Sequence, residues 1–279
     1  MKISVIMSAY NAENTITKAI KSVLNQSYSN LELIIVNDCS TDNTLDKIKE
    51  FNDSRIILVN NETNLGAGMA RRIGLTKITG DYTTFIDSDD YIEPDMYKTY
   101  VNYILRYNTD IVCGGYIYEH DNGNIIKVNI PKFRLDFEED RFKDNDAKTK
   151  RFLVNTFIKA SLWNNVEYSH RRYIEDSPTS YKLIFFSKNI LNIPYAGYHY
   201  VHQPNSLIHS ASNFKNIVYR CLVSKDLIEF LKEQGAEYDY KTFKANMRDL
   251  KAYNCKEWNK YKEELNELFE YEKLIKSEK

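Results

Sequence analysis

The feature that most limits the fold of this chain is a regular alternation of short apolar runs and helical segments through its first ninety residues. The apolar runs are residues 3–7, 33–36, 56–59 and 82–86, and segments with apolar residues at helical spacing lie between them at 16–24, 45–51 and 69–78. Continuous apolar runs are typical of parallel strands buried on both faces. Strand, helix and strand in repetition favour right-handed crossovers. The pattern therefore predicts an α/β fold with a doubly wound, mostly parallel sheet.

The rest of the chain changes character twice. A helix is expected from Pro94 to residue 107, then a strand at 111–113 and a hairpin over 116–128 that turns at Asn122-Gly123. Residues 131–150 are charged and irregular and predict a surface loop. Beyond residue 210 the apolar spacing is helical throughout. We therefore expect one α/β domain over 1–210 and a helical C-terminal extension over 211–279.

Charge and composition exclude several classes of protein. Thirty-eight Lys and Arg against 39 Asp and Glu give a net charge of −1, so no overall field directs the chain to nucleic acid or an anionic membrane. The four cysteines show no C-x-x-C spacing, which argues against a zinc site and a disulfide framework. Neither a signal peptide nor an apolar run of about 18 residues is visible. These features predict a cytoplasmic location, with peripheral contact at the inner face of the membrane left open.

Polar side chains follow each of the four predicted parallel strands. They are Ser8, Ala9, Tyr10 and Asn11; Asn37 to Ser40; Asn64 to Gly68; and Asp87, Ser88, Asp89 and Asp90. Ligands of open α/β sheets bind beyond the carboxyl ends of the strands, so these loops predict one shared site. Three carboxylates within four residues repel one another without a partner, which favours a bound divalent cation, Mn²⁺ or Mg²⁺. The alternative is an acidic turn that caps the next helix.

Glycine-rich motifs of the common nucleotide-binding folds are absent. Gly66-Ala67-Gly68 follows the third strand, and position 71, where the dinucleotide motif needs a third glycine, is Arg71. No G-x-x-x-x-G-K-[ST] sequence occurs, which excludes a P-loop. Gly66 and its neighbours can still offer backbone N–H groups to a phosphate or serve tight packing. Of Arg71 and Arg72, one is expected to contact a phosphate or nucleotide.

Several separated blocks together resemble the family 2 glycosyltransferases of the GT-A fold. The blocks are Ser4 to Asn11, Ser22 to Ser27, Ile34 to Asp42, Asn64 to Arg71 and Gly80 to Asp90. The resemblance covers about residues 2–115, thins between 155 and 210 and is absent beyond 210. It implies a nucleotide-sugar-binding half over about 1–115 and an acceptor-binding half over about 116–210.

The resemblance also implies roles for individual residues. A nucleotide sugar is expected to bind at Ser8, Ala9, Tyr10, Asn11, Asp38, Gly66, Arg71, Asp87, Ser88 and Asp89. Asp87-Ser88-Asp89 corresponds to the D-x-D element, with Asp89 as the metal ligand, Asp87 beside it and Asp90 as an alternative. The sequence departs from the family pattern at Asn37 and Cys39, which replace an Asp and a Gly, and at Arg72, which replaces an Asn.

The second half is expected to supply the general base. Glu175-Asp176 resembles the Glu-Asp pair of the family, with Asp176 as the base and Glu175 orienting the acceptor or the base. The alternative is a helix N-terminus, where acidic side chains are favoured. Trp163 either lies near the acceptor or packs in the core. His202 replaces the arginine of relatives and is a candidate metal or diphosphate ligand, with a structural role as its alternative.

The resemblance implies an inverting transfer of a sugar from a nucleoside-diphosphate donor, UDP favoured, to a hydroxyl. The expected acceptor is a saccharide or lipid-linked saccharide in bacterial-type polysaccharide or glycoconjugate synthesis. Two alternatives are the same chemistry on a nucleic-acid base and a non-catalytic module that binds nucleotide sugar or glycan. Aromatic and basic residues interleave over 214–262, which fits either a nucleic-acid surface or amphipathic helices with core aromatics. Nucleotidyl transfer is disfavoured because Ser8 to Ala12 is neither glycine-rich nor basic.

Overall fold

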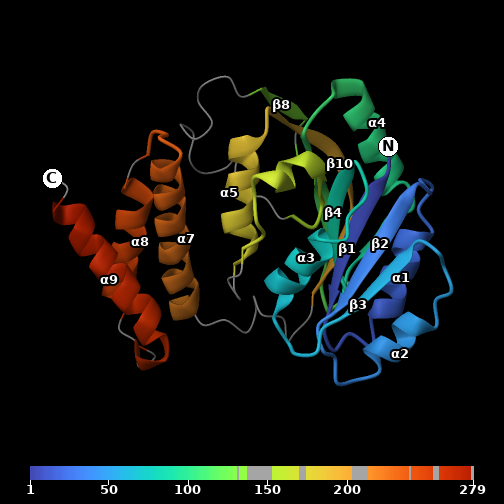
Figure 1. Cartoon of the computed structure of the whole chain (residues 1–279), viewed down its shortest axis with the longest axis horizontal. Helices are drawn as coiled ribbons and strands as arrows, with labels where there is room; N and C mark the ends of the chain where they lie inside the picture. The colour runs from blue at the N-terminus through green and yellow to red at the C-terminus, as the bar shows by residue number, and fades with distance from the viewer. Residues whose placement is uncertain are drawn as a thin grey trace. The chain divides into compact units, whose positions relative to one another are not determined.

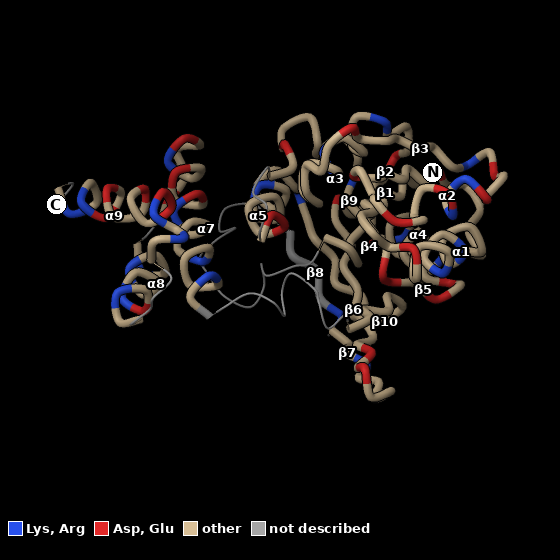
Figure 2. The backbone as a smooth tube through the Cα atoms, turned by 90° about the horizontal axis from the view of Figure 1, so that it is seen from below, with Lys and Arg blue, Asp and Glu red and all other residues tan. Residues whose placement is uncertain are grey.

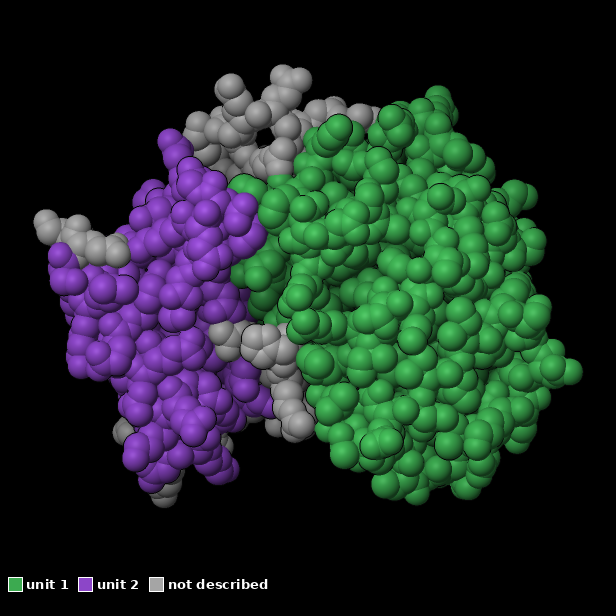
Figure 3. Space-filling model, in the orientation of Figure 1, with its two compact units in different colours: residues 1–203 green, residues 204–279 purple. Residues whose placement is uncertain are grey.

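The computed structural model describes residues 1–130, 132–136, 153–169, 174–202, 213–238, 240–253 and 258–277. The chain forms two compact units, Met1–Gln203 and Pro204–Lys279, which Figure 3 distinguishes by colour. The predicted boundary after residue 210 falls within 203–212, outside the described residues, so it stays a prediction.

The first unit contains a ten-stranded mixed sheet whose first part is parallel. Its strands run in the order β3-β2-β1-β4, and their bounds are β1 Ile3–Ala9, β2 Leu31–Asn37, β3 Ile56–Asn60 and β4 Tyr82–Asp87. The crossover helices are α1 Ile16–Leu24, α2 Thr44–Lys49 and α3 Ala67–Leu75. Helices α1 and α2 lie on one side of the sheet and α3 on the other (Figure 1). Because helices cover both faces, β1 and β2 are almost wholly buried, as their apolar runs predict.

The sheet continues from β4 through β9 and β6 to β10 and β5, and the pairing is antiparallel except between β6 and β10, which are parallel. The bounds are β5 Tyr91–Ile92, β6 Ile111–Glu119, β7 Ile125–Val128, β8 Phe133–Asp136, β9 Thr156–Lys159 and β10 Asn189–Val201. Helices α4 (Met96–Tyr107) and α5 (Asp176–Phe186) and the 3-10 helix η1 (Ala160–Asn164) complete the unit.

Most expectations for this region are confirmed, and one is wrong in part. The helix that ends at residue 107 and the hairpin of β6 and β7 are both present, and Gly123 in the turn has φ +81°. The loop predicted over 131–150 contains β8, which pairs with β10. Its strand character comes from that pairing partner, which lies more than fifty residues further along the chain. Residues 131 and 137–150 lie outside the described part.

The second unit is helical, as predicted. It contains α7 (Asn213–Glu233), α8 (Lys241–Ala252), the 3-10 helix η2 (Trp258–Tyr261) and α9 (Lys262–Ser277). Phe214 and Phe243 are fully buried in its own core, and other aromatic side chains of 214–262 pack against that core. The expectation of core aromatics is therefore confirmed. Lys and Arg positions mix with Asp and Glu along these helices (Figure 2).

Among the described residues, none of the helices combines the length and the apolar character that crossing a bilayer requires.

Candidate functional site

The carboxyl ends of the parallel strands bring the predicted loops together. Ser8, near the end of β1, lies opposite Asp87 of β4 in the register. The loop after β1 is joined to the loop after β2, because Asn11 Oδ1 accepts a hydrogen bond from the Thr41 N–H (2.9 Å) and the Asn11 N–H donates to Ser40 Oγ (3.1 Å). Loops that are distant in the sequence therefore lie side by side at this edge of the sheet.

Asp38 connects the loop after β2 to the start of α3. Its carboxylate accepts hydrogen bonds from Asn61 Nδ2 at 2.7 Å, from the Leu65 N–H at 3.0 Å and from the Gly66 N–H at 2.7 Å. Gly66 has φ +88° and ψ 160°, a backbone region that only glycine enters readily. The Gly66 amide is thus committed to Asp38, and the two residues together fix the loop that leads to Arg71.

Cys39 occupies the position where related sequences have glycine, and its backbone explains that preference. Its φ is +61°, in the left-handed region that costs a side-chain-bearing residue about 1 kcal/mol. We therefore expect Cys39→Gly to be more stable than Cys39→Ala by about 0.5–1 kcal/mol, the reverse of the usual order. Urea unfolding of the two variants measures this difference, and a more stable alanine variant would contradict the assigned backbone.

Three carboxylates gather after β4. Ligand atoms of Asp87, Asp89 and Asp90 lie within 4.8 Å of one another. Burial, followed by the charge of Asp87, raises the pKa of Asp89 to about 6. Within the described residues, the hydrogen bond to the Asp89 carboxylate comes from its own backbone N–H. Asp89 is thus a partly buried acid that no other described residue compensates by a hydrogen bond or an ion pair, which is the condition expected of a cation ligand.

Asp90 differs from Asp89 because the protein already satisfies it. Its carboxylate accepts hydrogen bonds from Tyr198 Oη at 2.5 Å and from the Val201 N–H at 2.9 Å. Tyr198 Oη in turn accepts a hydrogen bond from the Asp87 N–H at 3.2 Å. These contacts fix the acidic turn to β10. They favour Asp89 over Asp90 as the carboxylate that is available to bind a metal ion.

Arg71 is the centre of a buried network of charges. Its Nη2 lies 2.6 Å from Asp87 Oδ1, and its Nη1 lies 2.6 Å from Glu175 Oε1 and 3.5 Å from Asp176 Oδ1. The guanidinium side chain is only 6% exposed. By contrast, the neighbouring Arg72 is 38% exposed and pairs with Glu167, which is 78% exposed. Of the two arginines considered from the sequence, Arg71 is the one inside the site.

The predicted Glu175-Asp176 pair lies at the N-terminus of α5 and also inside this network, so its helix-terminal position is confirmed and its role as the base stays a prediction. Burial raises the pKa of Glu175, and the Asp176 charge adds to that rise while Arg71 opposes it. Tyr168 Oη donates a hydrogen bond to Asp176 Oδ1. Ile174, directly before the pair, has φ +55°, which is an outlier for a β-branched residue and typical of strained functional turns.

His202 lies apart from these carboxylates. Its Nδ1 is 2.8 Å from Tyr118 Oη and its Nε2 is 3.4 Å from Asp121 Oδ2, so it belongs to the group around the β6–β7 hairpin. Among the described residues, the metal-competent cluster consists of the three aspartates and does not include His202.

Trp163 packs between the core and the network. Its Nε1 donates to Thr83 Oγ1 at 2.8 Å and its ring packs against Phe85. The same ring stacks on Tyr168, which hydrogen-bonds to Asp176, so a place near the acceptor stays a prediction.

Tyr168 and Tyr198 are the site residues that sequence reasoning missed. Both are buried, and both hydrogen-bond to carboxylates of the network. The chain contains 22 tyrosines, and no local spacing distinguishes these two from the others. Only their tertiary neighbours identify them.

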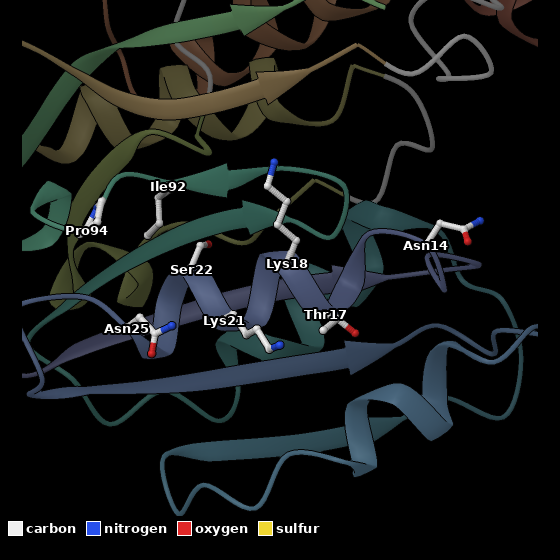
Figure 4. A pocket seen from close by; sticks show the side chains of 8 residues that line it. All are labelled: Asn14, Thr17, Lys18, Lys21, Ser22, Asn25, Ile92 and Pro94. Carbon is white, nitrogen blue, oxygen red and sulfur yellow. The ribbon is translucent and has the colours of Figure 1, made fainter.

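A separate groove of about 520 Å³ runs along α1 beside β5 (Figure 4). Its lining includes Lys18 and Lys21 of α1 with Ile92 and Pro94. None of the predicted site residues lines this groove. Lys18 extends from α1 toward β5, where its Nζ lies 3.2 Å from the centroid of the Tyr91 ring.

Comparison with known proteins gives a consistent picture. The family model described as "Glycosyl transferase family 2" matches residues 4–165. An uncharacterized glycosyltransferase of Haemophilus influenzae is 36% identical over 177 residues, which are 62% of this chain and 70% of that protein. The Escherichia coli protein WfgD, a UDP-Glc:alpha-D-GlcNAc-diphosphoundecaprenol beta-1,3-glucosyltransferase, is 39% identical over 130 residues. Those residues are 47% of this chain and 51% of WfgD, so this chain matches about half of that relative's length.

Solved structures show the same fold. The crystal structure of Staphylococcus aureus TarS 1-349 in complex with UDP-GlcNAc superposes with a TM-score of 0.65 at 21% sequence identity. The superposition covers 90% of this chain and 71% of that one. The predicted α/β fold of the GT-A type, with C-terminal helices, is thereby confirmed.

Proposed function

This chain belongs to glycosyl transferase family 2, and from that premise we propose that it transfers a sugar from a UDP-sugar to a hydroxyl acceptor by metal-assisted inverting displacement. The observation that carries the proposal is the Arg71 network. It joins Asp87 of the acidic turn to the Glu175-Asp176 pair of α5, which lies 104 residues from Arg71 in the sequence. The buried guanidinium of Arg71 thereby links the side of the site expected to bind the donor to the side expected to bind the acceptor.

The acidic turn fits a divalent cation. A hard cation prefers carboxylate oxygens, and Asp89 offers a carboxylate to which no other described residue donates a hydrogen bond. Asp89 would hold the ion with Asp87 beside it, while Asp90 keeps the turn in place through Tyr198. Bound there, Mn²⁺ or Mg²⁺ would neutralise charge on the diphosphate of the donor. His202 stays a prediction as a further ligand.

The protein's own residues would carry the remaining chemistry. Asp176 takes the proton of the acceptor hydroxyl while that oxygen bonds to the anomeric carbon and the bond to the leaving phosphate oxygen breaks. Its Oδ1 is oriented by Tyr168 and Arg71, whereas Oδ2 makes no hydrogen bond within the described residues. Glu175 is held by Arg71 at 2.6 Å, so it positions the pair and Asp176 is the freer base.

Arg71 acts by positioning in this scheme. Its guanidinium is occupied by carboxylates on both sides, so its effect on a bound diphosphate would be electrostatic. Ser8, Ala9, Tyr10 and Asn11 would contact the nucleotide, since Ser8 is aligned with Asp87 and Tyr10 is 49% exposed beyond the strand end. Asp38 and Gly66 would support the same region through the loop that they fix.

The relatives support UDP as the nucleotide and a lipid-linked saccharide as the acceptor. WfgD uses UDP-Glc and a GlcNAc-diphosphoundecaprenol acceptor according to its name, and TarS was crystallised with UDP-GlcNAc. The first test is therefore release of UDP from UDP-glucose and UDP-GlcNAc with and without Mn²⁺. Metal-dependent release supports the proposal. Binding of UDP without turnover of any donor or acceptor would instead indicate the binding-module alternative.

Asp176→Asn should affect sugar transfer to an acceptor much more than hydrolysis of the donor. We expect transfer to a GlcNAc-diphospholipid acceptor to fall by about 10²–10⁴-fold, because an amide cannot accept the hydroxyl proton. Slow hydrolysis of the donor by water should change far less, since the donor side remains intact. Initial rates of both reactions test this, with the exposed Glu167→Gln as the matched control. Equal losses in transfer and hydrolysis would contradict a base role for Asp176.

A further inference from the structure

The two faces of β10 serve different groups at the edge of the acidic turn. Tyr198 contacts Asp90 from one face of the strand. The next residue, His199, points to the opposite face, because side chains alternate along a strand. In the antiparallel register His199 lies opposite Tyr91 of β5, and their rings stack with centroids 4.1 Å apart. His199 is therefore placed beside the segment that follows the acidic turn.

Both ring nitrogens of His199 face carboxylates. Nδ1 is 2.7 Å from Glu119 Oε1, and Nε2 is 2.9 Å from Glu93 Oε1. The residue is 8% exposed, so solvent competes little for these contacts. A neutral imidazole has one N–H, and an ionised carboxylate can only accept. The two contacts are both satisfied only when the ring carries a proton on each nitrogen.

The charges around the ring support that state. Glu119 also accepts a hydrogen bond from Tyr91 Oη. Burial by itself would raise the pKa of Glu119, but the hydrogen bonds from Tyr91 and His199 lower it below its usual value. Lys18 Nζ lies over the Tyr91 ring, and because His199 occupies one face of that ring, Lys18 covers the other. Glu93, Glu119, Lys18 and a protonated His199 together balance in charge.

We infer that His199, as an imidazolium, is a positioning residue that fastens β5, and with it the acidic turn, to β10. Strand β5 has only two residues, so few backbone hydrogen bonds hold it. Asp90 is tied to β10 by Tyr198 and Val201, and Glu93 is tied by His199 and by its N–H to Gly197 O at 2.8 Å. Asp89 lies directly before this doubly fastened segment. The role of Asp89 as a metal ligand rests on the proposed function, whereas the attachment of β5 to β10 by His199 does not.

The protonation state can be tested without any assay of activity. In ¹⁵N-histidine-labelled protein, the His199 ring signals are assigned by their loss in His199→Gln. We expect shifts typical of two N–H groups at neutral pH, and Glu93→Gln with Glu119→Gln should move them toward a neutral ring. One bare ring nitrogen in the wild type would overturn the inference, including the case in which Glu93 holds the proton instead.

The effect on the acidic turn is measured by calorimetry with Mn²⁺ and UDP. His199→Phe keeps a ring on Tyr91 but removes both N–H groups, and we expect it to weaken Mn²⁺-dependent UDP binding by about 10-fold. His120→Phe is the matched control, since His120 contacts Tyr118 only edge-on and should leave binding unchanged.

These outcomes separate the two proposals. Wild-type protein that binds no UDP with Mn²⁺ would count against the proposed function, and the ring shifts would still test whether His199 fastens β5 to β10. If the wild type binds UDP and His199→Phe binds it equally well, the positioning role alone would be overturned. If His199→Phe does not fold, His199→Gln, which keeps one donor, takes its place in the titration.

Discussion

Asp89→Asn is expected to reduce Mn²⁺-dependent release of UDP by about 10³-fold. Asp89 offers the one carboxylate of the acidic turn to which no other described residue donates a hydrogen bond. An amide carries no charge and is a weaker ligand for a hard cation. Initial rates with and without Mn²⁺ measure the effect, and Asp46→Asn on the exposed face of α2 is the control.

The same substitution should stabilise the metal-free protein. Burial and the neighbouring Asp87 raise the pKa of Asp89 to about 6, so its charged form is disfavoured in the folded state. Replacing it with a neutral side chain relieves that repulsion, and we expect the free energy of unfolding to rise by about 1–3 kcal/mol at pH 7. Thermal unfolding in chelator measures this gain. Retained Mn²⁺-dependent release in Asp89→Asn, or a loss of stability, would contradict the assigned role.

Arg71→Ala should be the most destabilising change in the site, because it leaves Asp87, Glu175 and Asp176 without their shared cation. Removing one partner of a buried ion pair costs about 3–5 kcal/mol. The neighbour Arg72→Ala breaks only an exposed pair with Glu167 and should cost less than about 1 kcal/mol. Chemical unfolding of the two variants, adjacent in the same helix, provides a closely matched comparison.

Activity should follow the same contrast. Arg71→Lys keeps a positive charge, but a single ammonium group cannot contact Asp87 and Glu175 in the forked geometry of the guanidinium. We therefore expect Arg71→Lys to lose most transfer activity while Arg72→Lys retains it. Rates with a common UDP-sugar measure the difference. Similar activity in the two lysine variants would show that the Arg71 network does not position the catalytic groups.

The parallel half of the sheet could be predicted because its signals are local. Each strand from β1 to β4 carries a short, mostly apolar run, and each is followed by the polar residues that form the site edge. Strands β9 and β10 carry no comparable pattern. Their place in the sheet depends on pairing with residues far along the chain, such as Thr83 with Ile158 and Tyr91 with His199. Hydrophobic period cannot specify such partners.

Individual site residues divide in the same way. Asp87, Asp89 and the Glu175-Asp176 pair stand out in the sequence because acidic residues are adjacent or nearly adjacent there. Tyr168, Tyr198 and His199 do not stand out, since each acts through a partner on another element. His202 shows the opposite case, because its position suggested a metal ligand and the fold pairs it with Tyr118 and Asp121.

The sequence by itself determined the α/β class, the helical C-terminal region and the acidic residues around which a site would form. These follow from period and charge, which act over a few neighbouring residues. Only the tertiary structure decided that Arg71 joins the carboxylates of β4 and α5, and that β10 presents Tyr198 to Asp90 and His199 to Glu93 and Glu119. Burial gives those contacts their strength, and burial is a property of the folded chain.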